Sequence, residues 1–415
     1  MTVYAFTMSS AGGEFGRRVR AALKAQGLSI RAASRAMVYN HAFLSRVLAG
    51  KQLPSPELAE SLDRLLNANG EIIEAAARLL DGEASPADQS SASAPTLADF
   101  LPEGDPLGLL TVRSPRRVGV GEVHDLQKRV HGLRLADDVL AGGDLIGPAL
   151  RELRSTVRLY RENTHTEEVG RALLIQIGEL AQIAGWIASD AGRHEEAERI
   201  YRLGLSAARQ AEDHTLAGNL AGSLAYQMSN TGRTGEGLTL AQAALSGAGD
   251  DAPGKARALY WDRVAWAHTQ AGGHENARAA MRALGEASEA LADDSTDEPP
   301  AYLYWVDAGE LQVMESRVYT ELRRPLRAVP LLRDVLGGYD ATHTREMALY
   351  LSWLAIALAD ANEPEESAAV AERVIRIAAD VASERTAERV RVVLARLQEY
   401  DDVPEVAALL ADNAA

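Results

Sequence analysis

A repeat of 40 residues in the second half of the chain constrains the fold more than any other feature. Three segments align at this spacing: GWIASDAGRHEEAERIYRLGL (185–205), AYQMSNTGRTGEGLTLAQAAL (225–245) and AWAHTQAGGHENARAAMRALG (265–285). Each segment has apolar residues at helical spacing on both sides of a glycine-containing turn. A fixed period of helix pairs predicts a superhelical array, in which each unit buries its apolar face against its neighbours.

Small residues recur at the same interval, which indicates how the two helices of a unit approach each other. They stand at Gly185, Ala225 and Ala265, and the turn glycines at Gly192, Gly232 and Gly272. In the first unit, Ala197 and Tyr201 are predicted to fill the space between the helices. This pattern resembles the tetratricopeptide repeat, with helices longer than its usual unit. The resemblance covers residues 170–380, with looser units near 316–336 and 356–376.

A second helical region lies at the N-terminus and is divided into shorter pieces. Residues 15–80 read as five short helices, at 15–26, 29–37, 40–50, 55–66 and 70–80. Ser29, Asn40 and Ser55 are natural N-caps, and Pro56 suits a first helical position. Because no alternating strand pattern is seen from 120 to 412 either, the predicted fold class is all-α, with a five-helix head and a repeat superhelix.

The head resembles the phage-repressor-like helix-turn-helix family, of the XRE type, through LSIRAASRAMVYNHAFLSRVLAGKQLPSPE. That resemblance implies that the third helix enters the major groove of DNA. Helical spacing buries Leu44, Val47 and Leu48 and turns the opposite face outward. Two departures stand out: Val38 occupies a turn position where the family usually has glycine, and Ile30 a position where it often has glutamine. The candidate DNA-binding residues are Ser29, Arg31, Asn40, His41, Ala42, Phe43, Ser45, Arg46, Lys51 and Gln52.

The distribution of charge agrees with a head that contacts DNA. The whole chain carries a net charge of −16, but residues 1–66 contain nine basic and four acidic side chains, a balance of +5. A basic head can follow a phosphate backbone while the acidic body is repelled by it. Arginine is also the side chain best suited to bidentate contact with guanine, which makes Arg46 the leading candidate for reading a base.

Composition places the domain boundaries between these two helical regions. GEASPADQSSASAP is small, polar and proline-bearing, as linkers are, whereas the following LADFLPEGDPLGLL is more apolar. We therefore predict a helix-turn-helix domain at 1–81, a linker at 82–118 and a sensor and dimerisation domain at 119–415.

Head and repeats together resemble actinobacterial regulators that join this helix-turn-helix to a tetratricopeptide array. They resemble more distantly the peptide-sensing regulators of Gram-positive bacteria, which implies a signalling peptide or small molecule inside the superhelix. The register places polar and aromatic residues of the first helices on the concave face, and Asp and Glu among them favour a neutral or basic ligand. The candidate ligand-binding residues are Gln182, Trp186, Asn219, Tyr226, Asn230, Asp262 and Trp266. Glu179 also lies on this face, and looser units add Glu310, Tyr350 and Trp353. Alternatively, the tryptophans fill the core of the superhelix.

Other classes of function are disfavoured. The chain has no cysteine, which excludes disulfides, thiol nucleophiles and cysteine-bound zinc. No paired histidine spacing indicates a metal, and TGRTGEG (231–237) lacks the lysine of a phosphate loop. We expect no enzyme activity, no cofactor and no membrane span, and a cytoplasmic location.

The predicted function is a DNA-binding transcription regulator whose affinity for a double-stranded operator responds to a ligand in the repeats. The alternative is an interaction scaffold, whose repeats bind a partner protein and whose head serves as a tether. Since one helix-turn-helix covers only a half-site, we also expect a homodimer.

Overall fold

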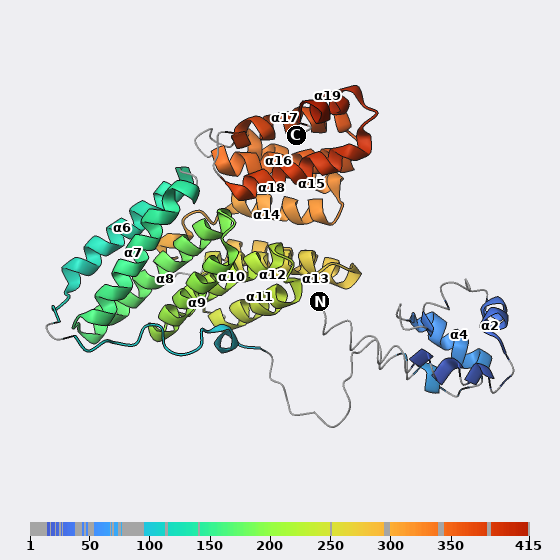
Figure 1. The fold of residues 1–415 in the computed structure, drawn as a ribbon, viewed down its shortest axis with the longest axis horizontal. Coiled ribbons are helices and arrows are strands. Elements are labelled where there is room, and N and C mark those ends of the chain that lie inside the picture. The colour runs from blue at the N-terminus through green and yellow to red at the C-terminus, as the bar shows by residue number, and fades with distance from the viewer. Residues whose placement is uncertain are drawn as a thin grey trace. The chain divides into compact units, whose positions relative to one another are not determined.

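The computed structural model divides the chain into two compact units, residues 1–93 and 94–415. In the described residues the regular elements are α-helices and short 3₁₀ helices, with an isolated bridge between Arg117 and Thr164 (Figure 1). The predicted all-α fold class is therefore confirmed. The structure describes residues 15–16, 18–20, 22–24, 26, 28–37, 44, 47–48, 54–66, 68, 70–73, 76, 95–112, 115–139, 142–249, 251–293, 299–338, 344–379 and 383–413.

The first unit contains α2 (Ile30–Ala36) and α4 (Pro56–Leu66), and further helical residues at 15–16, 18–20, 22–24, 44, 47–48, 71–73 and 76. Two predicted caps are present. The Ser29 Oγ accepts a hydrogen bond from the Ala32 N–H (3.1 Å), and the Ser55 Oγ accepts one from the Leu58 N–H (3.2 Å). Each satisfies an N–H that the first turn of a helix leaves without a partner.

One apolar core holds the pieces of the first unit together. Leu44, Val47 and Leu48 are at most 1% exposed, so the predicted buried stripe is confirmed. Asp63 accepts hydrogen bonds from the N–H groups of Gly70 (2.8 Å) and Ile72 (3.0 Å), which fixes the start of the last helical segment. The other core residues are Phe15, Val19, Leu23, Ala33, Leu58, Ala59, Leu62, Leu66, Ile72 and Ala76.

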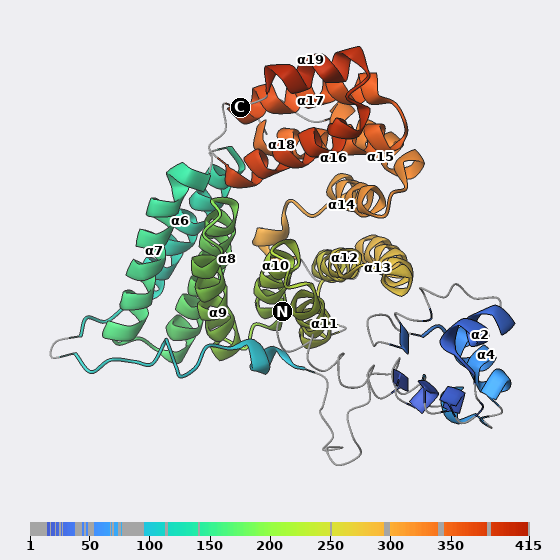
Figure 2. The same ribbon diagram turned by 45° about the vertical axis from the view of Figure 1, so that its right-hand side comes forward.

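The second unit is a succession of antiparallel helix pairs that stack in chain order (Figures 1 and 2). The pairs are α6 (Val120–Val139) with α7 (Gly142–Glu162), α8 (Glu167–Asp190) with α9 (His194–Gln210), α10 (His214–Asn230) with α11 (Thr234–Ala248), α12 (Gly254–Ala271) with α13 (His274–Ala292), α14 (Ala308–Glu321) with α15 (Pro325–Gly338), and α16 (Thr344–Asp360) with α17 (Pro364–Ala379). At the end of the array, α18 (Glu384–Leu397) packs on α16 and α17, and α19 (Pro404–Asp412) packs on α17. Short 3₁₀ helices lie at η1 (Leu97–Phe100), η2 (Ala301–Leu303) and η3 (Gln398–Tyr400). The first helices of the pairs from α8 to α16 contact one another in chain order, and α16 contacts α18, which builds a continuous inner layer.

The repeat turns lie where the sequence places them. Gly192, Gly232 and Gly272 have φ of +74°, +85° and +71°, a region that glycine adopts without strain. In the two looser units, Arg323 and Asn362 occupy the corresponding turns with φ of +54° and +64°. The 40-residue period is therefore a true structural repeat, and its outer units keep the turn geometry without the glycine.

Within the first repeat, the small residue on α8 allows close contact with α9, as predicted. A Cβ built on Gly185 would lie 2.6 Å from the Tyr201 ring, and Tyr201 is only 1% exposed. Ala197, one turn earlier on α9, is fully buried beside it. The ring of Tyr201 thus occupies the space that a side chain at 185 would need.

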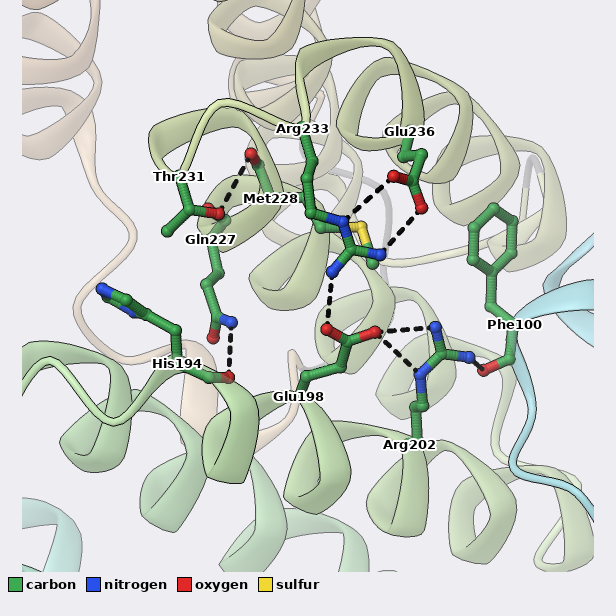
Figure 3. Close-up of polar contacts among 9 residues, drawn as sticks. All are labelled: Phe100, His194, Glu198, Arg202, Gln227, Met228, Thr231, Arg233 and Glu236. Atoms are coloured by element: carbon green, nitrogen blue, oxygen red, sulfur yellow. Dashed lines mark hydrogen bonds and ion pairs between the residues drawn. The ribbon is translucent and has the colours of Figure 1, made fainter. Parts of the chain in front are cut away.

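Part of the predicted linker at 82–118 packs on the helices. Leu107 is 1% exposed, and Leu97 and Phe100 pack against the core of the second unit. The Arg202 Nη1 donates to the Phe100 carbonyl (2.7 Å) (Figure 3). The Leu110 N–H donates to the Arg161 carbonyl (2.8 Å). Segments of the predicted linker thus pack against the array at Leu97, Phe100 and Leu107, whereas Leu109 and Leu110 are exposed, and the predicted linker bounds stay a prediction.

The glycine-rich segment 231–237 comprises the turn between α10 and α11 and the first turn of α11, and its charges join two repeats (Figure 3). Its Arg233 binds Glu236 in the same turn (2.7 Å) and Glu198 on the preceding repeat (2.6 Å). Glu198 also binds Arg202 (2.8 Å). The Arg233 guanidinium thus forms ion pairs with two carboxylates of the array.

α8 is long and apolar enough to cross a membrane by length and composition, but 67% of its most apolar window is buried inside the structure. Neighbouring helices α6, α7, α9 and α10 contact it. This burial is what the core helix of a helical array shows.

Candidate functional site

Most of the predicted DNA-reading residues lie outside the described part of the chain. These are Asn40, His41, Ala42, Phe43, Ser45, Arg46, Lys51 and Gln52, together with Val38 in the turn and the side chain of Arg31. Ser29 is described: it is exposed, and its hydroxyl caps α2. The DNA contacts proposed for these residues therefore remain predictions.

The structure does show how the reading segment is anchored on its buried side. The Arg20 Nη2 donates a hydrogen bond to the Leu48 carbonyl (2.8 Å). A Cβ built on Gly16 would overlap that same carbonyl, so the first helix approaches the chain at Leu48 as closely as a backbone can. Sequence reasoning missed both contacts, although a glycine inside an otherwise helical pattern was a signal of close approach.

Basic side chains of the first unit are directed to solvent. Arg18, Arg20 and Lys24 on the first helical segment are exposed, as is Arg64 on α4. Such side chains can bind phosphate oxygens, which positions a protein on DNA without reading its sequence.

The second unit contains a pocket of ≈ 520 Å³ on its inner layer of helices. It is lined from α6, α8, α10, α12, α14, α15, α16 and α18 and from the segment between α13 and α14. Its volume falls in the range of about 300–1,000 Å³ that small-molecule sites occupy. The pocket brings together residues from 134 to 385, far apart in the sequence.

Only some of the predicted ligand-binding residues line this pocket. Gln182, Trp186, Asn219, Glu310 and Tyr350 do. The predicted residues Tyr226, Asn230, Asp262, Trp266 and Trp353 are absent from its lining, and Glu179 is instead paired with Arg134 (2.7 Å).

Four of the predicted aromatic residues form a column beside the pocket. Ring centroids are 5.7 Å apart for Trp186 and Tyr226, 6.0 Å for Tyr226 and Trp266, and 5.8 Å for Trp266 and Trp353. Trp266 and Trp353 are 4% and 5% exposed, which agrees with the alternative that they fill the core. Trp266 also donates from Nε1 to the Asn230 Oδ1 (3.0 Å), so that this amide oxygen has a partner inside the protein.

Four arginines pack on the faces of this column, and sequence reasoning missed all of them. Arg263 lies 4.7 Å from the Tyr226 centroid, Arg317 4.4 Å from Trp266, Arg389 3.6 Å from Trp353, and Arg385 5.4 Å from Trp186. We call these four residues the arginine cluster. The available signal was the Arg-Val pair at 263–264 and again at 317–318, because a charged residue on the apolar face of two repeats is unusual.

Tyr226 is the residue on which the cluster converges. Its Oη accepts hydrogen bonds from the Arg317 Nη2 (2.5 Å) and the Arg385 Nη2 (2.9 Å). Burial alone would raise the pKa of Tyr226, but the charges of Arg317, Arg385 and Arg263 outweigh it and lower the pKa to about 8. The cluster thus stabilises negative charge at this point of the structure.

Two predicted acidic residues lie near the cluster. Asp262 is 2% exposed, and its Oδ2 is 3.4 Å from the Arg263 Nη1. Glu310 accepts a hydrogen bond from the Tyr350 Oη (2.7 Å). Burial raises the pKa of both carboxyl groups, so both are less readily ionised than ordinary acids.

Comparison with known proteins identifies the first unit. Residues 14–76 match the family described as a helix-turn-helix domain. No curated protein and no solved structure is significantly similar to the chain. The chain thus carries an N-terminal helix-turn-helix domain, which indicates a DNA-binding regulator, joined to an array of helical repeats.

Proposed function

We propose that the chain is a sequence-specific transcription regulator of the cytoplasm, whose affinity for its operator is set by a small molecule or peptide bound in the repeat pocket. It acts by binding and not by catalysis. The observation that carries the proposal is the presence, in one chain, of a helix-turn-helix domain and a ligand-sized pocket lined by successive repeats.

The DNA-binding half is supported by the head. Its family match covers the segment with the basic excess, and its buried stripe at Leu44, Val47 and Leu48 lies in the domain core. The Arg20 contact to Leu48 anchors that segment to the first helix. Because this contact already orders the reading segment, binding to DNA costs little further conformational entropy, which favours specific recognition.

The ligand-binding half is supported by the position of the pocket. Its walls come from helices of many repeats, so an occupant contacts several units at once. A ligand changes DNA affinity only if it binds one arrangement of the array better than another. Small changes between neighbouring repeats add along a superhelix, which makes such arrangements accessible.

A homodimer belongs to the same proposal, because two heads would read two half-sites about 34 Å apart or at multiples of that spacing. Exposed apolar side chains on α6 and in the segment that precedes it in the chain offer a contact surface: Leu109, Val120 and Leu135 are 62%, 68% and 46% exposed. Light scattering of the free and DNA-bound protein tests this point, and a monomer in both states would refute it.

The DNA-binding proposal is tested by sequencing the genomic fragments that the full-length protein retains. Arg46→Ala should weaken binding to the best site by about 1–3 kcal/mol if Arg46 reads a base. Arg391→Ala, an exposed arginine of α18, serves as the matched control and should leave binding unchanged. Equal loss on all sequences would make Arg46 a phosphate contact, and no retained fragment at any salt concentration would refute DNA binding.

The ligand proposal is tested on the same operator with a low-molecular-mass extract of the cells that make the protein. The extract should change the operator Kd of the wild type but not that of Asn219→Ala or Trp186→Ala, since both side chains line the pocket. Melting curves must show that both variants are folded. Unchanged DNA affinity in the wild type, with a partner protein captured instead by the repeats, would favour the scaffold alternative.

A further inference from the structure

The arginine cluster indicates what kind of ligand the pocket accepts, an inference that rests on the proposed ligand site. Arg263, Arg317 and Arg385 all line the pocket and come from α12, α14 and α18. Arg263 and Arg317 are 6% and 7% exposed. Guanidinium groups so far removed from water are stable only when opposite charge or hydrogen-bond acceptors compensate them.

Within the described residues, the Tyr226 hydroxyl and a few carboxylates compensate the arginine cluster. The four arginines are opposed by the buried Asp262 and the half-buried Glu310, with the exposed Glu321 acting on Arg389 from the end of α14. Burial and the neighbouring arginines lower the pKa of Arg389 to about 10 in spite of Glu321. Arg389 itself does not line the pocket, whereas Arg317 does, and Tyr226, Asp262 and Glu310 together raise the pKa of Arg317 in spite of its burial.

Two buried hydrogen-bond donors of the arginine cluster have no partner among the described residues. The Arg317 Nε and the Arg389 Nη2 are buried and have no hydrogen-bond acceptor among the described residues. A buried donor left without an acceptor costs about 1–3 kcal/mol, and more when it is charged. An anionic oxygen entering the pocket beside Arg317 would relieve this cost, and charge-assisted hydrogen bonds to guanidinium are about twice as strong as neutral ones.

The pocket is also lined by acidic side chains other than Glu310. Asp307 caps the start of α14, where its Oδ1 accepts from the Glu310 N–H (2.9 Å), and Asp334 belongs to α15. Both are exposed, whereas the cluster is packed against the buried aromatic column. Asp137 and Glu346 also line the pocket, from α6 and α16. The exposed acids of the pocket are thus Asp307 and Asp334, while Glu310 lies beside the buried Arg263 and Arg317.

We propose that the pocket binds a small organic anion, whose carboxylate or phosphate oxygens accept hydrogen bonds from Arg317 and Arg385 and whose apolar part contacts Trp186. This replaces the neutral or basic ligand expected from the acidic residues of the sequence. Of those residues, Glu179 is paired with Arg134 and Asp262 lies against Arg263, so neither is left to recognise a cation.

A charge series on one aromatic framework tests the proposal with the full-length protein. Calorimetric titration compares naphthalene-2-carboxylate, naphthalene-2-carboxamide and naphthalen-2-ylmethylammonium, which share shape but differ in charge. The carboxylate should bind at least about ten-fold more tightly than the amide, and the ammonium more weakly still. 2-Naphthyl phosphate is a fourth arm: tighter binding than the carboxylate would assign the site to phosphate oxygens.

Arg385→Gln should weaken carboxylate binding at least about ten-fold. Arg391→Gln on the same helix should not, because Arg391 is exposed and pairs with Glu384 and Glu388. Melting curves check that both variants are folded. If Arg385→Gln is unfolded, the charge series measured on the wild type decides whether the proposal holds. Equal binding of the amide or ammonium, no binding of any probe, or an unaffected, folded Arg385→Gln would overturn the proposal.

The operator Kd, measured separately, distinguishes this inference from the proposed function. If the protein binds the carboxylate but neither the carboxylate nor the cell extract changes its operator Kd, the anion site is supported and the ligand-responsive function is refuted. An operator response to the extract without binding of either anionic probe supports the function and removes the anion site.

Discussion

Replacing Gly185 by alanine tests how the repeats pack. Two effects oppose each other in this variant. Alanine in place of glycine inside a helix gains up to about 1 kcal/mol of intrinsic helix stability. Against this, the new Cβ would lie 2.6 Å from the Tyr201 Cε1 and 2.8 Å from its Cδ1 and Cζ.

The contact with Tyr201 should decide the outcome. The ring must move by roughly 1 Å to restore ordinary van der Waals distances, and a fully buried ring has little room to move. Overpacking of this kind costs about 1–3 kcal/mol. Gly285→Ala is the matched control, because Gly285 also lies inside a helix but its Cβ would meet no atom within 4 Å. Gly185→Ala should therefore be less stable than Gly285→Ala by roughly 1–3 kcal/mol.

Urea unfolding followed by tryptophan fluorescence measures this difference in the full-length protein. All five tryptophans of the chain lie in the second unit, so the signal reports on the repeats and not on the head. If Gly185→Ala and Gly285→Ala were equally stable, the close packing of α8 on α9 would be refuted as a source of stability.

Three further predictions concern other parts of the molecule. Gly16→Ala should destabilise the head by about 2 kcal/mol or more, since its Cβ would overlap the Leu48 carbonyl, and a loss of operator binding with unchanged tryptophan fluorescence checks this. Arg202→Ala should release the segment at η1, because it removes the hydrogen bond to the Phe100 carbonyl, and faster proteolysis within 97–101 is the expected sign. The Tyr226 pKa of about 8 lies below the ordinary value of 10, so ionised Tyr226 favours the folded array. The stability of the wild type relative to Tyr226→Phe should therefore rise as the pH increases from about 8 to about 10 and be lost as it falls through 8; a constant difference over this window would contradict the assignment.

The repeat could be predicted from the sequence because periodicity is a local property. Gly192, Gly232 and Gly272 mark turns that need positive φ, and the spacing of 40 residues then fixes which helices pair. The caps at Ser29 and Ser55 were accessible for the same reason, since each acts within one helical turn. The place where residues 97–118 dock could not be predicted from the sequence, because it depends on apolar contacts with helices far along the chain.

The pocket was only partly predictable. Register along one repeat correctly placed Trp186 and Asn219 among the residues that line it. It did not show that Tyr226 and Trp266 pack side by side in a column, because that depends on the rotation between neighbouring units. The arginine cluster was missed since charged residues are usually exposed, and only the tertiary structure reveals that Arg317 is buried against aromatic faces.

The central claim is that the chain recognises a particular DNA sequence, and a pair of dissociation constants tests it most directly. The full-length protein is titrated with its best genomic site and with a scrambled duplex of the same composition, over salt concentrations from about 50 to 200 mM. We predict that the genomic site binds at least about a thousand-fold more tightly than the scrambled duplex, and that both constants weaken steeply with salt. Equal affinity for the two duplexes, or no binding to either, would contradict the claim.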